Sequence, residues 1–225
     1  MAAPAHVSTL LMRNVSLFSV LSEHQLTLLI GAVGRKSFPR GTTIIAAGDT
    51  TDTLYIVLSG RLKVMMSDEE GHEVILAILG PNEYFGEMGL LDDHPRSANV
   101  VAIETCELLT LSKRDFKQCL VDNFEMNMTV MRGLVKRLRD ADRKIGSLAL
   151  MDVYGRVARL LLEMAETVDG QKVVTKKLAK QDIAKMIGAS REMVSRVMKD
   201  LQGSGFIEVR AGSIFLHDNI AHVHD

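Results

Sequence analysis

The sequence is poor in cysteine and in long hydrophobic runs, and both absences exclude classes of protein. Its 225 residues contain two cysteines, Cys106 and Cys119, which have no paired spacing. Neither a disulfide framework nor a cysteine-based metal cluster is therefore indicated. No stretch approaches the roughly 18 unbroken apolar residues that a membrane span requires. The opening "MAAPAHVS" lacks the charged start and apolar core of a signal peptide, so we expect a cytoplasmic protein with no membrane partner.

Catalytic groupings are lacking as well. The sequence contains no nucleophile with a matching base, no metal-ligand set and no nucleotide-hydrolysis motif, so we do not expect an enzyme. His217, His222 and His224 near the end are too loosely spaced to indicate a structured metal site. No metal is therefore predicted.

Charge is distributed unevenly along the chain. The net charge is −1, but residues 172–199 contain eight basic and two acidic side chains, a local charge of +6. The rest of the chain therefore carries −7. Since basic patches attract polyanions, this pattern indicates a basic module attached to an acidic one.

In the first half of the chain, the spacing of apolar residues changes from helix-like to strand-like. Residues 10–35 are predicted to be helical, because leucines recur at helical spacing and Ser22 supplies an N-cap. From Phe38 onward, short runs rich in β-branched residues alternate with glycines, for example "TLYIVLSGRLKVMM" and "HEVILAILG". Several short strands with turns between them predict an antiparallel barrel or jelly roll.

The stretch 124–150 has a heptad pattern, which predicts a helix about 40 Å long. The apolar positions are Phe124, Asn127, Met131, Leu134, Leu138, Ala141, Ile145 and Leu148. A helix packed on its own domain would show a wider apolar stripe. The narrow stripe favours a homodimer seam between two such helices, although packing within the chain stays an alternative.

Residues 178–218 have the pattern of a winged helix-turn-helix. One short apolar-faced helix ends at Gly188, which suits a tight turn with positive φ, and Ser190 can cap a second helix. On the second helix, Met193, Val194, Val197 and Leu201 are expected to face inward. "GFIEV" and "IFLH", joined by "RAGS", then predict a hairpin beside the helices.

The second of these helices carries the residues expected to read DNA. The start of a recognition helix reaches base edges in the major groove, where arginine can bond guanine and glutamate can accept from cytosine. The polar residues at its start and along its exposed face are Ser190, Arg191, Glu192, Ser195, Arg196 and Lys199. The alternative is an ordinary solvated helix pair with surface ion pairs.

The stretch "FGEMGLLDDHPRSANV" (85–100) combines one glutamate and one arginine in a glycine-containing loop. Arg96 and the adjacent Ser97 suit a phosphate group, whereas Glu87, which only accepts hydrogen bonds, suits a sugar hydroxyl. Gly86 and Gly89 allow the backbone to approach a ligand. The alternative is that Glu87 and Arg96 only pair with each other and close the loop.

This stretch resembles the phosphate-binding cassette of cyclic-nucleotide-binding domains. With the heptad helix and the winged helix-turn-helix, residues from about 15 to 218 resemble the cAMP receptor protein (CRP/FNR) family of bacterial transcription regulators. The resemblance implies an α+β protein with a sensor domain (1–122), which is an antiparallel β jelly roll. It also implies a long dimerisation helix (123–150) and a DNA-binding domain (151–225).

The resemblance also assigns roles to individual residues. Glu87 would bind the ribose 2′-hydroxyl, and the cyclic nucleotide would also be held by Gly86, Met88, Arg96, Ser97 and Ala98. A TGTGA-like half-site in double-stranded DNA would be read by Arg191, Glu192 and Arg196, and Lys180 and Gln181 would contact phosphates. Leu150, Met151 and Asp152 would form the hinge between the long helix and the DNA-binding domain. RNA polymerase is the further partner expected of such a regulator.

Two departures from the family pattern concern the signal that is sensed. The redox branch of the family carries an N-terminal cysteine cluster for iron–sulfur ligation, and this chain has none. The family's Thr-Ser pair, which contacts the adenine amino group, is replaced by Ala141 and Asp142. Asp142 could accept from the donor edge of guanine or from the adenine N6 amino group, or it could form an ion pair with Arg137 of a second copy.

The sequence thus predicts a homodimeric DNA-binding transcription regulator with a cyclic purine nucleotide as its effector and no covalent cofactor. The leading ligand is cAMP. The same architecture responding to cGMP or cyclic di-GMP is one alternative, and a regulator active without ligand is another. A nucleotide-binding module without DNA function is a third.

Overall fold

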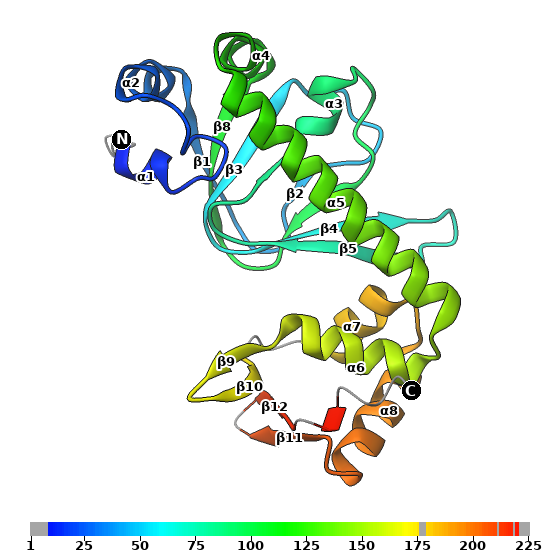
Figure 1. The fold of residues 1–225 in the computed structure, drawn as a ribbon. Helices are drawn as coiled ribbons and strands as arrows, with labels where there is room; N and C mark the ends of the chain where they lie inside the picture. Colours follow the sequence, from blue (N-terminus) through cyan, green and yellow to red (C-terminus); the bar gives the residue numbers. More distant parts are fainter. Residues whose placement is uncertain (1–8, 176–178, 211, 218, 221–225) are drawn as a thin grey trace. The chain divides into compact units, whose positions relative to one another are not determined.

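The computed structural model describes residues 9–175, 179–210, 212–217 and 219–220 (Figure 1). The chain divides into two compact units, Met1–Arg137 and Leu138–Asp225. Each unit has its own hydrophobic core. The long helix α5 (Phe124–Leu150) contributes residues to both units.

The first unit contains two four-stranded antiparallel sheets, with strand orders β1-β8-β3-β6 and β2-β7-β4-β5. The strands are β1 (Gly34–Phe38), β2 (Thr43–Ile45), β3 (Thr53–Ser59), β4 (Leu62–Ser67), β5 (Glu73–Leu79), β6 (Tyr84–Phe85), β7 (Asn99–Ala102) and β8 (Cys106–Ser112). The predicted antiparallel β jelly roll is confirmed.

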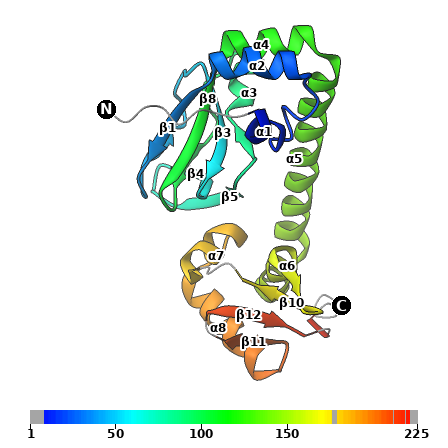
Figure 2. The ribbon, with the colours of Figure 1, turned by 90° about the vertical axis from the view of Figure 1, so that its left-hand side faces the viewer.

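Strand β3 shows how the two sides of the first sheet are built. Its residues alternate between two cores, as a strand with side chains on both faces requires. Tyr55 and Val57 pack in a core shared by residues of both sheets. Leu54 and Ile56 pack with residues of helices α1 (Thr9–Arg13), α2 (Glu23–Ala32), α4 (Lys113–Asp122) and α5. These helices cover one side of the sheet (Figures 1 and 2).

The prediction for residues 10–35 was right in type and wrong in extent. The segment contains two helices, α1 and α2, and strand β1 begins at Gly34. Ser22 caps α2 in a capping box with Gln25, as the cap signal predicted. Helix α4 was missed, although Ser112 caps it by accepting from the backbone N–H of Asp115 at 3.1 Å.

The second unit contains α6 (Val153–Met164), α7 (Lys180–Ile187), α8 (Arg191–Gly203) and a four-stranded antiparallel sheet of order β11-β12-β10-β9. The predicted helix-turn-helix is α7 and α8. The predicted wing is β11 (Ile207–Arg210) and β12 (Ser213–Leu216), which pair with each other. Gly188 ends α7 with φ of 62°, and the Ser190 side chain accepts from the N–H of Met193.

A hairpin of β9 (Glu166–Val168) and β10 (Gln171–Val174) follows α6. One detail of this unit differs from prediction. Met193 was expected to face inward but is 43% exposed, because Met198 fills the core beside Val194 and Val197.

Helix α5 uses its apolar residues in two ways. Met126 and Val130 are buried in the first unit, and Leu134 packs partly against the same core. Asn127, predicted in the seam, instead donates to the carbonyls of Leu120 and Asn123. The remaining seam is exposed in this single chain, with Phe124, Met131, Leu138 and Ile145, spaced seven apart, 47–72% exposed.

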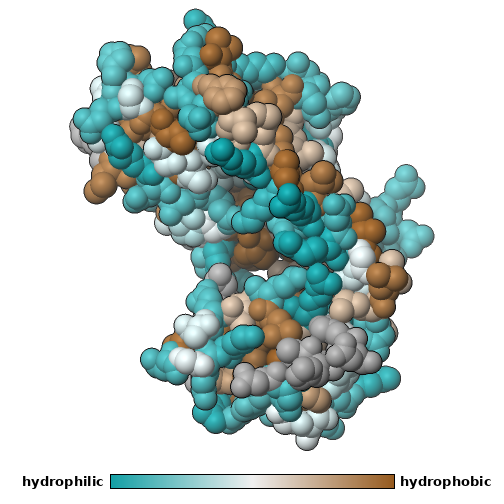
Figure 3. Space-filling model, viewed as in Figure 1, coloured by the Kyte–Doolittle hydropathy of each residue, from teal (hydrophilic) through white to brown (hydrophobic). Residues whose placement is uncertain are grey.

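Hydrophobic surface therefore lies next to hydrophilic surface along α5 (Figure 3). One side of this helix packs within the chain, as the alternative expected, and another side keeps an exposed heptad stripe. That this stripe forms a homodimer seam stays a prediction. Within the described ranges, no helix has the length and apolar character needed to cross a membrane.

Candidate functional site

The cassette consists of β6, the short helix α3 (Glu87–Leu91) and a loop leading to β7. The stretch was expected to be a loop, and α3 is the part that sequence reasoning missed. Gly86 precedes α3 with φ of 87°, a conformation that favours glycine. The sequence thus places Glu87 at the first turn of a helix and Arg96 at the end of the following loop.

The two cassette glycines leave room for the chain's own groups. A Cβ atom on Gly86 would lie 2.8 Å from Arg96 Nη1, and one on Gly89 would lie 2.8 Å from the carbonyl oxygen of His94. We expected these glycines to admit a ligand. In the structure, the absence of a side chain at these two positions lets the loop pack closely against Arg96.

Arg96 is almost fully buried and is held by four hydrogen bonds. Its Nε donates to Thr51 Oγ1 at 2.9 Å, and its Nη2 donates to the carbonyls of Thr51 and Thr53 at 2.6 and 2.7 Å. Its Nη1 donates to the carbonyl of Gly86. Since a guanidinium has five N–H groups, a single N–H on Nη1 lacks an acceptor among the described residues.

Glu87 is fully buried, and only one of its oxygens has a partner. Oε1 accepts from Nη1 of Arg137 on α5, whereas Oε2 has no partner among the described residues. Burial raises the pKa of Glu87 above its ordinary value, and the positive charge of Arg137 opposes that rise. The expected alternative, a direct pair between Glu87 and Arg96, does not occur; Arg137 takes that place.

Arg137 is the functional candidate that the sequence did not reveal. It also donates to the carbonyl of Tyr84 at 2.7 Å, and its guanidinium lies 5.3 Å from the centroid of the Tyr84 ring. The heptad pattern placed Arg137 at the edge of a seam, opposite Asp142 of a second copy. No local signal indicates Glu87 as its partner, because the two residues are 50 positions apart.

Helix α5 reaches the cassette because residue 133 is glycine. A Cβ atom there would lie 2.4 Å from Tyr84 Oη, a distance that real contacts do not show. The close approach of the α5 backbone to Tyr84 brings Arg137, one turn further on, to Glu87. Gly133 therefore permits the ion pair between the helix and the cassette.

The other predicted ligand contacts line the same stretch. Met88 and Ser97 are exposed, and Gly86 and Ala98 are half-buried. The Ser97 hydroxyl has no hydrogen-bond partner within the described part of the chain. Asp142 and Ala141 are exposed on α5 and belong to the other compact unit, so the structure does not test whether they meet the cassette.

The residues fit a ligand that has a hydroxyl and an anionic group. A buried carboxylate oxygen without a donor can accept from a hydroxyl, which would satisfy it. The free Nη1 N–H of Arg96 and the Ser97 hydroxyl can both donate to a phosphate oxygen. A bidentate contact from Arg96 to phosphate would require its guanidinium to leave at least one of the carbonyls that now hold it.

All seven residues predicted to contact DNA are exposed on the helix-turn-helix. They are Lys180, Gln181, Ser190, Arg191, Glu192, Arg196 and Lys199. Lys180 Nζ donates to Ser195 Oγ at 2.9 Å, which joins the start of α7 to the middle of α8. The polar side of α8 thus exposes both basic and acidic groups, and their contact with DNA bases stays a prediction.

The predicted hinge lies where two helices meet. α5 ends at Leu150, which is exposed, and the side chain of Asp152 caps α6 by accepting from the Gly155 N–H at 2.8 Å. Met151 lies between them, and its sulfur accepts from Ser147 Oγ at 3.4 Å. The chain changes from one helix to the next here, and a hinge movement stays a prediction.

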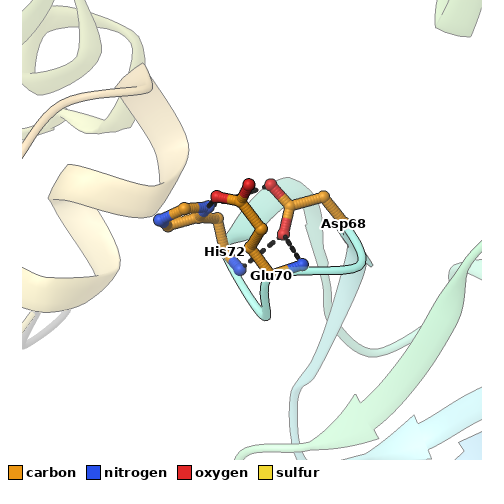
Figure 4. A group of neighbouring side chains, drawn as sticks. All are labelled: Asp68, Glu70 and His72. Atoms are coloured by element: carbon orange, nitrogen blue, oxygen red, sulfur yellow. Dashed lines mark hydrogen bonds and ion pairs between the residues drawn. The ribbon is translucent and has the colours of Figure 1, made fainter.

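One further cluster lies at the turn between β4 and β5 (Figure 4). Potential ligand atoms of Asp68, Glu70 and His72 lie within 4.8 Å of one another, and all three residues are exposed. Asp68 Oδ1 accepts from the N–H groups of Glu70 and His72, and His72 Nδ1 lies 2.9 Å from Asp68 Oδ2. These hydrogen bonds account for the cluster as part of the turn. His222 and His224 lie outside the described residues.

Comparison with known families defines the class of protein. A model of the cyclic nucleotide-binding domain matches residues 35–123, and a model of the Crp-like helix-turn-helix domain matches residues 155–219. The chain therefore combines a nucleotide-sensor domain with a DNA-binding domain.

Individual relatives agree with this class. The chain is 33% identical over 186 residues to the CRP-like cAMP-activated global transcriptional regulator of Mycobacterium tuberculosis, covering 81% of this chain and 83% of the relative. It is 34% identical over 192 residues to the cAMP-activated regulator Vfr of Pseudomonas aeruginosa, covering 81% and 88%. The chain belongs to the CRP/FNR family of transcription regulators, which are not enzymes.

Solved structures add a second kind of effector among the relatives. The c-di-GMP responsive regulator CLP of Xanthomonas campestris has a TM-score of 0.74 and 27% identity, covering 87% of this chain and 99% of that one. The Thermus thermophilus Catabolite Activator Protein has a TM-score of 0.54 and 30% identity, covering 93% and 98%. Similar chains thus include regulators named for two different nucleotides.

Proposed function

We propose that this chain acts as a homodimer whose affinity for a palindromic, TGTGA-like DNA site is controlled by a cyclic purine nucleotide, with cAMP as the leading ligand. The observation that carries the proposal is the fully buried Glu87, whose Oε2 has no donor. An unsatisfied buried carboxylate oxygen costs free energy, and a ribose hydroxyl would remove that cost. The cAMP-activated relatives support cAMP as the first ligand to test.

The proposed contacts follow from the cassette. Glu87 accepts from the ribose 2′-hydroxyl, while Arg96, Ser97 and the Ala98 amide hold the cyclic phosphate. Gly86 and Met88 complete the sugar side. Arg137, already bonded to Glu87, favours the ionised carboxylate against the effect of burial on its pKa and holds Oε1, which leaves Oε2 for the hydroxyl. Each residue does only what its polar atoms permit: the carboxylate accepts, and the guanidinium, hydroxyl and amide donate.

Control of DNA binding would be a population shift. The ligand must bind the DNA-competent dimer more tightly than the other state, since equal binding to both would change nothing. In the competent state, the two α8 helices lie one DNA turn apart, ~34 Å between centres. Leu150, Met151 and Asp152 provide the proposed hinge. RNA polymerase is the expected further partner.

The dimer is proposed from the exposed stripe of α5. Four large apolar residues spaced seven apart and exposed to water are costly in a monomer and typical of a coiled-coil seam. Analytical ultracentrifugation of Leu138→Arg should show a monomer, whereas Leu28→Arg, at an equally exposed leucine on α2, should leave the dimer intact. A dimeric Leu138→Arg protein would count against this seam.

A guanine-containing nucleotide is the second candidate, and Asp142 is the observation that favours it. Its carboxylate can accept from the N1–H and N2–H₂ donors of guanine. The competing role, an ion pair with Arg137 of a second copy, has less support because Arg137 already bonds Glu87 and Tyr84. The similarity to the c-di-GMP responsive CLP also supports this candidate.

Isothermal titration of the purified protein against cAMP, cGMP and cyclic di-GMP tests the proposal. We expect one of them to bind, and Glu87→Gln to weaken that binding by about 10-fold or more, since an amide replaces a charged acceptor. Asp142→Ala should weaken a guanine ligand more than cAMP. If none of the three binds, the cassette is vestigial and the regulator is active without a ligand.

A further inference from the structure

Lys113, the first residue of α4, joins two loops at the phosphate end of the cassette. Its Nζ lies 2.7 Å from Asp93 Oδ1 and 3.3 Å from Asp52 Oδ1. Its backbone N–H also donates to the carbonyl of Asp52 at 2.9 Å. One residue therefore holds the loop before β3 by two bonds and the cassette loop by a third.

Asp93 is the point at which the cassette loop is held. It has φ of 60°, in the left-handed region that non-glycine residues rarely adopt. Such a conformation persists where surrounding contacts stabilise it. Lys113 supplies one contact, and Lys117 Nζ supplies a longer one at 3.4 Å. The two lysines lower the pKa of Asp93, in agreement with favourable charge contacts.

The loop before β3 is the segment that holds the guanidinium of Arg96. Three of its four acceptors, Thr51 Oγ1 and the carbonyls of Thr51 and Thr53, belong to the residues on either side of Asp52. The backbone N–H of Arg96 donates to the carbonyl of Asp49 at 2.8 Å. Lys113 thus bonds the centre of the segment that receives Arg96 and also the loop that carries Arg96.

We propose that Lys113 is a positioning residue for Arg96: it holds residues 51–53 and 92–96 together, so that the guanidinium stays in place when a phosphate binds. This inference rests on the proposed function, in which Arg96 meets the cyclic phosphate. A bidentate phosphate contact requires Arg96 to release a carbonyl. Lys113 keeps the two loops in the same relative position while the phosphate replaces that carbonyl. Without Lys113, part of the binding free energy must be used to order the loops.

An isolated ion pair at the surface would have little effect, and this network differs from one in two ways. The side chain of Lys113 is only 27% exposed, although its partners Asp52 and Asp93 are 73% and 62% exposed. Lys113 also forms ion pairs with two carboxylates at once, and its backbone N–H is hydrogen-bonded to the carbonyl of Asp52. Networks of this kind contribute more than single exposed pairs do.

The first test uses the ligand-free protein and does not depend on any nucleotide. Lys113→Met keeps the aliphatic stem and removes the charge. We expect faster amide hydrogen exchange in residues 92–98 of this variant, but not in Lys117→Met, which loses only the longer contact to Asp93. Equal exchange in the wild type and Lys113→Met would show that Lys113 does not position the loop.

The second test measures the consequence by titration with cAMP, cGMP and cyclic di-GMP. For any nucleotide that the wild type binds, Lys113→Met should raise the Kd by about 5-fold, a coupling typical of residues in one network. Lys117→Met should change the Kd by less than about 2-fold, and Lys113→Arg should restore binding. The double variant Lys113→Met/Asp93→Asn should bind no worse than Lys113→Met alone.

The outcomes separate the two proposals. If the wild type binds none of the three nucleotides, the proposed function fails, and the exchange measurement alone decides the positioning role. If the wild type binds but Lys113→Met binds equally well, the inference about Lys113 is wrong and the proposed function stands. A thermal denaturation midpoint shared by the wild type and Lys113→Met would exclude a general loss of stability as the cause.

Discussion

The cassette and the recognition helix both depend on charged residues, but the fold treats those residues in opposite ways. Glu87 and Arg96 are the buried charged residues of the described chain. Arg96 donates to three carbonyls and a hydroxyl, and Glu87 pairs with Arg137. On α8, by contrast, Arg191, Glu192 and Arg196 are exposed to solvent.

This difference has a general physical meaning. A buried charge must be paired and hydrogen-bonded, so the surrounding fold depends on it. An exposed charge costs the fold nothing and remains available for a partner. Substitutions in the cassette should therefore change both stability and nucleotide binding, whereas those of the exposed charged residues on α8 should change DNA binding alone.

Arg96→Ala should have the largest effect on stability. It removes four hydrogen bonds made by a buried guanidinium, three of them to the carbonyls of Gly86, Thr51 and Thr53, and should lower the free energy of unfolding by about 3 kcal/mol. Chemical denaturation followed by circular dichroism measures the change. Arg35→Ala, which removes a partly exposed pair with Glu107, should cost at most about 1 kcal/mol. An equal loss of unfolding free energy in the two variants would contradict the difference between buried and exposed charged residues.

Arg191→Ala should separate DNA binding from stability. Loss of a bidentate contact to guanine should weaken binding to a TGTGA-like duplex by about 1–3 kcal/mol, or roughly 5- to 150-fold. The free energy of unfolding should change by less than about 0.5 kcal/mol, because the side chain is exposed. Fluorescence anisotropy measures the first effect and denaturation the second. Unchanged DNA affinity would favour a nucleotide-binding module without DNA function.

Two glycines of α5 allow a matched test of how the helix meets the cassette. Gly133→Ala places a Cβ against Tyr84 Oη and should destabilise the protein by about 1–3 kcal/mol through overpacking. Gly146→Ala has no neighbouring atom within 4 Å and should stabilise it by about 0.5–1 kcal/mol through helix propensity. Thermal denaturation of the wild type and both variants measures these two changes in stability. A stabilised Gly133→Ala protein would show that the approach to Tyr84 is not close.

Two serine caps provide the smallest and most evenly matched comparison. Ser112→Ala removes the N-cap of α4 in the first unit, and Ser190→Ala removes that of α8 in the second. Each should lower stability by about 1 kcal/mol. Only Ser190→Ala should also weaken DNA binding, because Ser190 lies beside Arg191. If both variants weakened DNA binding equally, the effect would come from general destabilisation.

The sequence predicted the elements that rest on local patterns. Short runs rich in β-branched residues, separated by glycines, predicted the β domain, and the apolar faces, Gly188 and Ser190 predicted the helix-turn-helix. These signals are local, since each residue type reports the conformation of its own segment. The missed helix α3 has five residues, lies in a stretch assigned to a loop, and follows Gly86, which has no side chain to cap it. Helix α4 was also missed, although Ser112 caps it.

The cassette was predictable in its residues but not in its contacts. Glu87 and Arg96 were recognised as a pair of charges at a suitable spacing, yet the structure separates them. Arg137 approaches Glu87 only because Gly133 lets α5 pack against Tyr84. That arrangement depends on tertiary packing between segments about 50 residues apart, and one sequence holds no local record of it.

The central claim is that a cyclic nucleotide bound through Glu87 controls DNA binding through α8. The most direct test is the affinity of the wild type and of Glu87→Gln for a labelled palindromic TGTGA-type duplex, with and without cAMP, cGMP and cyclic di-GMP. The proposal predicts that one nucleotide strengthens or weakens duplex binding by about 10-fold in the wild type and has little effect in Glu87→Gln, within the range of allosteric coupling. A duplex affinity that none of the three nucleotides changes would contradict it.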